Sequence, residues 1–237
     1  MSRSVVIRFA LLAGLALGAL LPATLGFGLG GALVNERASV DTLGGDADAA
    51  SSWSSVSDDG RFVAFASDAS NLVAGDDNIA RDIFAQDRTT GGTELVSIAT
   101  DGTQGNTTSG TITAGPPRLS ADGRYVVFSS SANNLVESDN NAADDIFVRD
   151  RLNGTTELVS IDSSGPLDSG GVQGNDHSIT PSISGDGRYV TFTSFADNLV
   201  EDDDNGTWDV FLHDRESGVT ELLSVATDGT HGNLSSG

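Results

Sequence analysis

The stretch PRLSADGRYVVFSS at residues 117–130, followed by DIFVRDRLNGTTELVS at residues 145–160, decides the fold of this chain of 237 residues. Its anchor, S-x-D-G-R, occurs three times, at Ser57–Arg61, Ser120–Arg124 and Ser184–Arg188, so the copies start 63 and 64 residues apart. The segments around each anchor recur in the same order, and self-similarity at a fixed period is the signature of a repeat architecture. The chain is therefore built from copies of one unit.

Each copy contains four segments that are typical of β-strands, which we label A to D. A short segment ends at the anchor serine, and after the Asp-Gly pair comes a run such as RFVAFAS (61–67), rich in β-branched and aromatic residues. An acidic loop leads to DIFAQDR (82–88), and a short Thr/Gly turn leads to TELVSIA (93–99). Asp-Gly between apolar runs predicts a hairpin with a type I′ turn, in which both central residues have positive φ. Each copy is predicted to be a four-stranded antiparallel meander.

Strand B is apolar at successive positions, from Phe62 to Phe65, which predicts that both faces of the sheet are buried. Such a sheet must pack between similar sheets, and four-stranded repeats packed face to face describe a β-propeller. The fold class is all-β, because no helical periodicity follows residue 35. We expect complete blades at residues 54–100, 117–162 and 181–226, and residues 36–40 match the last strand of an earlier blade.

On these motifs the chain resembles the TolB-type WD-like β-propeller repeat over roughly residues 36–237. The resemblance implies the propeller fold but no single activity, because such blades serve as scaffolds, binding platforms and peptidase gates. A closed propeller usually has about four to eight blades, and this chain has three. We therefore expect further blades in a longer protein, since the chain begins and ends within a blade. The alternative is a homodimer that closes a six-bladed ring.

The N-terminal residues predict export. Arg3 and Arg8 precede a run without charged residues, which reaches from Phe9 to Val34 and is interrupted at Pro22. This pattern predicts a signal peptide at residues 1–32, and the alternative is an uncleaved membrane anchor. Either way the repeats are expected to be extracytoplasmic, that is periplasmic, secreted or on the cell surface. Contact with a membrane is expected only if the segment stays uncleaved.

The composition excludes several classes of function. Asp and Glu number 34 against 12 Lys and Arg, for a net charge of −22, so no nucleic-acid partner is expected. The absence of Cys excludes disulfides, thiolate catalysis and Cys-ligated zinc. A further interpretation is that the acidic surface is an adaptation to high salt, without bearing on any ligand.

The loop between strands B and C carries the one motif that suggests site chemistry. It reads D-[DN]-N-x-x-x-D, and oxygen ligands at its first, third and seventh positions suit a hard cation, so we predict Ca²⁺ as the cofactor. The competing interpretation is that Asp and Asn form Asx-turns and that the last Asp opens strand C. The final bidentate Glu of an EF-hand is missing. The candidate metal ligands are Asp76, Asn78, Asp82, Asp139, Asn141, Asp145, Asp203, Asn205 and Asp209.

Other polar residues favour structural roles. The Asp-Arg pairs at residues 87–88, 150–151 and 214–215 occur in every copy, which fits architecture better than a single active site. The histidines, His177, His213 and His231, are too scattered in the sequence to predict a metal site. Trp208, inside an acidic loop, is a weaker candidate for contact with a sugar or peptide.

The B–C and D–A loops are long and polar, whereas the A–B and C–D turns are short, so binding is expected at the B–C/D–A end. No G-x-S-x-G, H-E-x-x-H or P-loop motif occurs, and we predict no catalytic residues. The sequence therefore predicts a non-catalytic exported binding or scaffold module for a protein, peptide or glycan. The alternative is the propeller portion of a prolyl-oligopeptidase-like hydrolase whose catalytic domain lies outside this chain.

Overall fold

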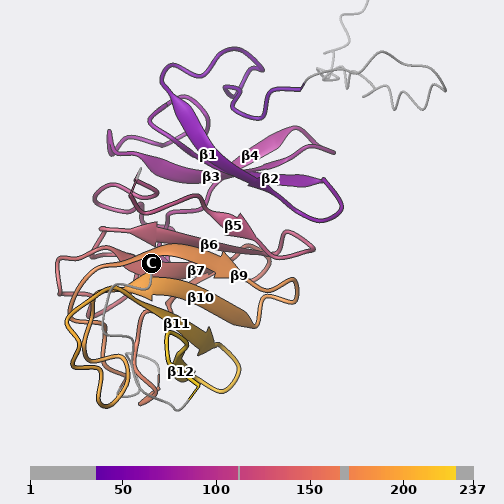
Figure 1. The fold of residues 1–237 in the computed structure, drawn as a ribbon. Coiled ribbons are helices and arrows are strands. Elements are labelled where there is room, and N and C mark those ends of the chain that lie inside the picture. Colours follow the sequence, from indigo (N-terminus) through magenta and orange to yellow (C-terminus); the bar gives the residue numbers. More distant parts are fainter. Residues whose placement is uncertain (1–35, 112, 166–170, 228–237) are drawn as a thin grey trace, which may run out of the picture. The chain divides into compact units, whose positions relative to one another are not determined.

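Each copy of the repeat forms one four-stranded antiparallel sheet whose strands follow one another in chain order (Figure 1). The computed structural model describes residues 36–111, 113–165 and 171–227, and the predicted signal peptide at residues 1–32 lies outside these ranges. The described residues from Arg37 onward form one compact unit. Among the described residues, no helix is long and apolar enough to cross a membrane.

The three sheets confirm the predicted meanders, and we call them blades 1, 2 and 3. Blade 1 contains β1 (Ser51–Val56), β2 (Phe62–Ser67), β3 (Asp82–Asp87) and β4 (Gly92–Leu95). Blade 2 contains β5 (Arg118–Leu119), β6 (Tyr125–Ser130), β7 (Asp145–Asp150) and β8 (Thr155–Leu158). Blade 3 contains β9 (Ser178–Ile183), β10 (Tyr189–Ser194), β11 (Asp209–Asp214) and β12 (Val219–Leu222).

The hairpin between the first two strands of each blade is not the predicted type I′ turn. In blade 1 the positive φ occurs at Gly60, at 71°, and not at the preceding Asp59. The Gly60 amide donates to the Ser57 carbonyl at 2.8 Å, and the Ser57 hydroxyl donates to the Asp59 carboxylate at 2.6 Å. That carboxylate also accepts the Arg61 amide at 2.9 Å. The repeated serine and aspartate therefore build a wider turn in which only the final glycine is left-handed.

Apolar side chains fill the spaces between neighbouring blades. Ile83 of blade 1 packs with Phe128 and Phe147 of blade 2, while Ile146 on the opposite face of blade 2 packs with Phe192 of blade 3. Phe128 and Phe147 are direct cross-strand partners whose ring centroids lie 5.9 Å apart. The middle sheet is therefore buried on both faces by its neighbours, which confirms the predicted all-β, propeller-type packing.

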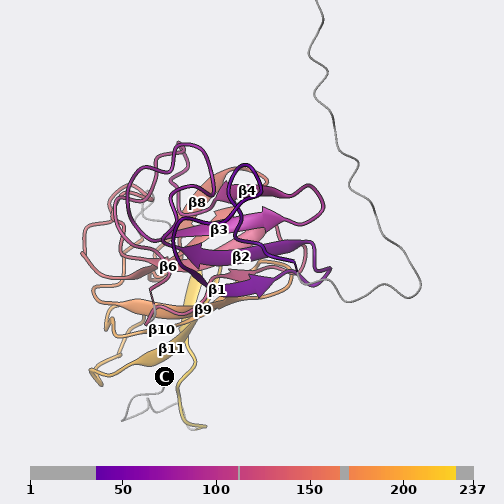
Figure 2. The same ribbon diagram turned by 90° about the horizontal axis from the view of Figure 1, so that it is seen from above.

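The blades converge along their first strands. Strands β1 and β5 are in contact, and so are β5 and β9, as expected when blades are arranged around an axis. The three described blades form an open arc and not a closed ring. Figure 2 shows the long loops on one side of the strands and the short turns on the other.

Strand A of blade 2 is interrupted, which distinguishes this blade from the other two. Ser109 forms an isolated bridge with β6, and the pairing resumes only at the short strand β5. Gly110 and Ala114, which lie between these two pairings, each face a neighbouring blade. A methyl group on Gly110 would lie 2.6 Å from the Cδ1 atom of Ile83 in blade 1, and the Ala114 carbonyl accepts the Thr180 amide of blade 3 at 2.9 Å. This segment between Ser109 and β5, which we call the insertion, therefore contacts one blade on each side.

The Asp-Arg pairs that end the third strand of each blade join elements together. Both oxygens of Asp87 accept hydrogen bonds from the Arg61 guanidinium, at 3.1 and 2.7 Å. Arg151 of blade 2 forms an ion pair with Glu94 of blade 1, and its guanidinium lies 4.2 Å from the ring centroid of Phe62. The structural role predicted for these pairs is confirmed, and it includes contacts between blades.

Candidate functional site on the loop face

The long loops of the described blades lie at one end of the strands, which we call the loop face (Figure 2). In a meander, the B–C loop and the loop that leads to the next blade leave from the same end. The B–C loops span residues 68–81, 131–144 and 195–208, and the D–A loops include residues 96–117 and 159–177. Every candidate metal ligand of the motif therefore lies on or at the base of this face.

A repeated Gln-Gly-Asn tripeptide in the D–A loop joins two blades. The Asn106 amide donates to Asn134 Oδ1 at 2.9 Å, and its side-chain amide donates to Asn133 Oδ1 at 2.6 Å. In return, the Asn134 side chain donates to the Gln104 carbonyl at 2.8 Å. Residues 173–175 form the corresponding bonds with blade 3. These bonds fix each D–A loop against the B–C loop of the following blade.

The last aspartate of each motif is a buried structural group at the start of strand C. Asp82 is fully buried, its Oδ1 accepts the Ser97 hydroxyl at 2.6 Å, and the same hydroxyl oxygen accepts the Ile83 amide at 3.0 Å. Asp145 and Asp209 repeat this arrangement with serines at 2.7 and 2.6 Å. Burial raises the pKa of Asp82 to about 6 and that of Asp145 to about 7. Each of these carboxyls ties strand C to the segment after strand D.

The motif asparagines of blades 1 and 2 use their oxygens within their own loops. Asn78 Oδ1 accepts the Ala80 amide at 2.9 Å, and its side-chain nitrogen donates to the Gly105 carbonyl at 2.9 Å. Asn141 makes the same two contacts one blade later. These are Asx-turns, as in the competing interpretation of the motif.

Nitrogen donors cover the second carboxylate oxygen in blades 2 and 3. The Gln173 amide nitrogen donates to Asp139 Oδ1 at 2.6 Å and to Asp145 Oδ2 at 2.9 Å, so it lies between the two carboxylates. In blade 3 the Asn205 side chain donates to Asp209 Oδ2 at 2.6 Å. Asp203, the remaining predicted ligand, is buried.

Blade 1 departs from this pattern. Among the described residues, Asp82 Oδ2 is buried and has no hydrogen-bond partner, whereas the Gln104 amide nitrogen donates to the Gly75 carbonyl at 2.7 Å. The negative charge of Asp76 adds to the effect of burial on the pKa of Asp82. Within residues 36–111, 113–165 and 171–227, no group of three or more His, Cys, Asp or Glu side chains is placed to hold a metal ion.

Sequence reasoning missed the two glutamines. Gln104 and Gln173 are neither charged nor part of the acidic motif, so motif searching gave them no role. The signal was the recurrence of Gln-Gly-Asn at residues 104–106 and 173–175, which suggests a contact that two of the D–A loops share.

The described histidines occupy separate environments. His177 Nδ1 accepts the Asp144 amide at 2.9 Å on the loop face. His213 is buried in β11, with its Nδ1 atom 2.9 Å from Thr220 Oγ1, and burial lowers the pKa of His213 to about 4. His231 lies outside the described residues. Trp208 packs edge-on against Phe195, with ring centroids 5.6 Å apart.

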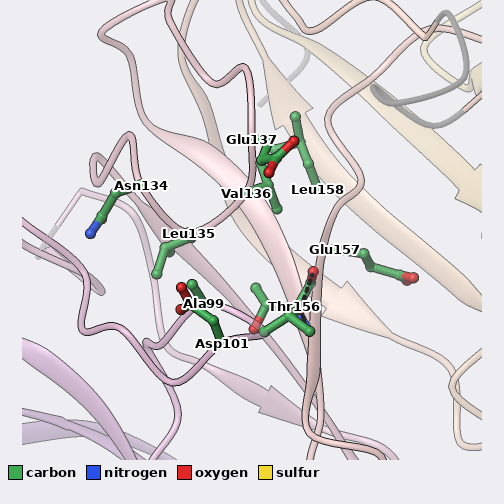
Figure 3. A pocket seen from close by; sticks show the side chains of 10 residues that line it. Ala99, Asp101, Asn134, Leu135, Val136, Glu137, Thr156, Glu157 and Leu158 are labelled. Atoms are coloured by element: carbon green, nitrogen blue, oxygen red, sulfur yellow. Dashed lines mark hydrogen bonds between the residues drawn. The ribbon is translucent and has the colours of Figure 1, made fainter.

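A pocket of about 440 Å³ lies between blades 1 and 2, beside strand β8 and two loops of the loop face (Figure 3). The B–C loop of blade 2, strand β8 and the D–A loop of blade 1 supply its walls. It combines apolar, amide, hydroxyl and carboxylate side chains, namely Ala99, Thr100, Asp101, Asn134, Leu135, Val136, Glu137, Thr156, Glu157 and Leu158. A second pocket, of about 380 Å³, lies beside β4 and includes Gln104, Arg149 and Arg151 in its lining.

No family model and no curated protein sequence matches the chain. Among solved structures, it is similar to TolB from Agrobacterium tumefaciens, with 19% identity, 78% of this chain and 53% of that chain covered, and a TM-score of 0.44. It is also similar to the β-propeller domain of the Trilobed protease from Pyrococcus furiosus, with 14% identity, coverage of 75% and 43%, and a TM-score of 0.43. A third similar structure is the acylaminoacyl peptidase of Pyrococcus horikoshii, at 15% identity, 74% and 25% coverage, and a TM-score of 0.40. The chain spans about half the length of the TolB structure.

Proposed function

We propose that this chain is a non-catalytic, exported propeller segment that binds a peptide portion of a partner protein on its loop face. The observation that carries this proposal is the pocket between blades 1 and 2 (Figure 3). Leu135, Val136 and Leu158 give it an apolar part, and Glu137 and Glu157 add carboxylates. A pocket of mixed apolar and charged lining on a rigid scaffold is the usual form of a specific binding site.

The charges favour a peptide that carries both basic and apolar side chains. Asp101 joins the two glutamates in the lining, and the chain as a whole has a net charge of −22. An acidic surface attracts basic ligands and repels anionic ones. The bonds between Asn106 and Asn134 hold the two walls of the pocket together before any ligand arrives. Binding at such a preformed site costs little ordering of the protein.

Export is the part of the proposal that rests on residues 1–32. An extracytoplasmic protein of this kind would lose those residues on secretion. Mass spectrometry of the protein recovered from outside the cytoplasm of an expressing bacterium would test this. A mature N-terminus near residue 32 is expected, and a full-length protein found only in the cytoplasm would contradict export.

The binding proposal can be tested with labelled peptides and fluorescence anisotropy. A peptide of alternating Arg and Leu is expected to bind, whereas peptides of Glu and Leu or of Gly and Ser are not. Glu137→Gln should weaken binding, because Glu137 lines the pocket. Asp58→Asn is the matched control, since Asp58 is exposed within the A–B turn of blade 1 at the opposite end and loses the same charge. Equal weakening by both variants would contradict a specific pocket.

Two further outcomes separate this proposal from its alternatives. Recovery of the intact peptide after long incubation is expected for a binding module, whereas cleavage would favour a hydrolase. Binding of neutral oligosaccharides in place of the Arg-Leu peptide would make a glycan the ligand.

A further inference from the structure

The acidic motif occurs in all three blades, so its hydrogen bonds in one blade can be compared with those in the others. In blade 2 the Gln173 amide nitrogen lies between Asp139 and Asp145 and donates to both. A positively polarised N–H₂ group thus occupies the space between two carboxylates. That space is the position in which a pair of acidic groups would hold a cation.

Blade 1 has the carboxylates but lacks this donor. Asp82 is 0% exposed and its Oδ2 has no hydrogen-bond partner in the part of the chain that the structure describes, whereas the corresponding oxygen of Asp145 accepts the Gln173 amide nitrogen. A buried oxygen of a carboxylate that has lost water and gained no donor is costly, and native structures contain few of them. A bound cation would stabilise this oxygen.

The Gln104 side chain contacts the backbone on both sides of Asp76, the other acidic residue of the motif. Its amide nitrogen donates to the Gly75 carbonyl at 2.7 Å, and its amide oxygen accepts the Asp77 amide at 3.5 Å. Gly75 and Asp77 are the two neighbours of Asp76, so the side-chain amide of Gln104 lies along the segment that carries Asp76. The contact at 3.5 Å is long and leaves the amide oxygen weakly used.

We propose that blade 1 binds one hard divalent cation, Ca²⁺, through the carboxylates of Asp76 and Asp82 and the amide oxygen of Gln104. Carboxylate and amide oxygens are the ligands that Ca²⁺ takes, and water completes its coordination. The site goes beyond the proposed peptide binding and does not depend on it. Blades 2 and 3 do not share the site, because Gln173 and Asn205 already donate to the corresponding oxygens.

The test is a titration of the full chain with CaCl₂, followed by calorimetry and by thermal melting. Asp76→Asn is the main variant, because Asp76 is only partly buried. Asp139→Asn is the matched control one blade later. Asp82 is left unchanged, since its bond to Ser97 supports the fold. Gln104→Glu is a second variant, which adds a carboxylate beside Asp76.

We expect one Ca²⁺ per chain, with the affinity lowered at least about tenfold by Asp76→Asn and kept by Asp139→Asn, because ligand charge sets calcium affinity. Gln104→Glu should tighten binding, which gives a readout even if Asp76→Asn fails to fold. The proposal is overturned if millimolar CaCl₂ produces neither heat nor a rise in melting temperature. It is also overturned if both Asn variants lose binding equally, or if NaCl at equal ionic strength produces the same stabilisation.

Discussion

Replacing Gly123 with alanine should destabilise the protein more than the same change at Gly60, although the two glycines occupy the same turn position. Both have a φ of 71°. A methyl group at Gly60 would have Arg88 Nη1 at 3.7 Å as its nearest neighbour, an ordinary contact. A methyl group at Gly123 would lie 2.3 Å from Cδ2 and 2.8 Å from Cγ of Phe62 in blade 1. The pair therefore separates the backbone cost from the packing cost.

The magnitudes follow from these two geometries. A left-handed alanine costs about 1–2 kcal/mol, so Gly60→Ala should lower the free energy of unfolding by roughly that amount. Gly123→Ala pays the same cost and also displaces the Phe62 ring, which Arg151 covers from 4.2 Å. Overpacking of this kind adds about 1–3 kcal/mol. The total for Gly123→Ala is then about 2–5 kcal/mol.

Urea denaturation at 25 °C, followed by far-UV circular dichroism, would measure both variants against the parent chain. Phe62→Ala should abolish the extra cost, so that Gly123→Ala in that background costs only what Gly60→Ala costs. Equal destabilisation by the two glycine variants, or an extra cost that persists without the Phe62 ring, would refute the reasoning.

Three further changes test other parts of the structure. Ile79 is 97% exposed with a φ of 56°, a strained conformation for a β-branched residue, so Ile79→Gly should raise the urea midpoint by the equivalent of about 1 kcal/mol; an unchanged or lower midpoint would argue against strain. Burial lowers the pKa of His213 from 6.5 to about 4. The stability that comes from keeping this imidazole neutral is therefore fully present above pH 6.5 and is lost as the pH falls towards 4. Blade 1 has Gln86 at the equivalent position, so His213→Gln is the variant to test. Between pH 6.5 and pH 4, the free energy of unfolding of this variant should fall by up to about 3 kcal/mol less than that of the parent chain. Parallel pH profiles of the two proteins would contradict this. In a double-mutant cycle the ion pair of Arg151 with the half-exposed Glu94 should contribute less than about 1 kcal/mol, and a larger coupling would show that solvent screens it poorly.

The strands could be predicted because their signals are local. Phe128 and Phe147 mark the centres of two strands, and an acidic loop separates them, so neither strand needed a distant partner to be found. The turn type could not be predicted from Asp-Gly alone. The Ser57 hydroxyl binds Asp59 and widens the loop, and dipeptide preferences do not include that bond.

The candidate site was only partly predictable. The motif predicted Asp139 and Asp145 as neighbours, and the structure brings both to the Gln173 amide, because only five residues separate them in the chain. Gln173 lies between these two side chains, although it is 34 residues after Asp139 and 28 residues after Asp145 in the sequence. A contact at that separation depends on how the D–A loop packs, and packing is not visible in a local pattern. The pocket between blades 1 and 2 was missed for the same reason, since its walls come from separate segments.

The interrupted strand of the middle blade has a consequence for how the chain reaches its native state. Repeats with nearly identical sequences risk exchanging strands during folding, and such misassembly is a characteristic failure of repeat proteins. The segment around Gly110 and Ala114 contacts Ile83 of blade 1 and Thr180 of blade 3. A first strand exchanged from blade 1 or blade 3, each of which runs without interruption, would not carry this segment. The break in symmetry thus gives the chain a way to tell its copies apart.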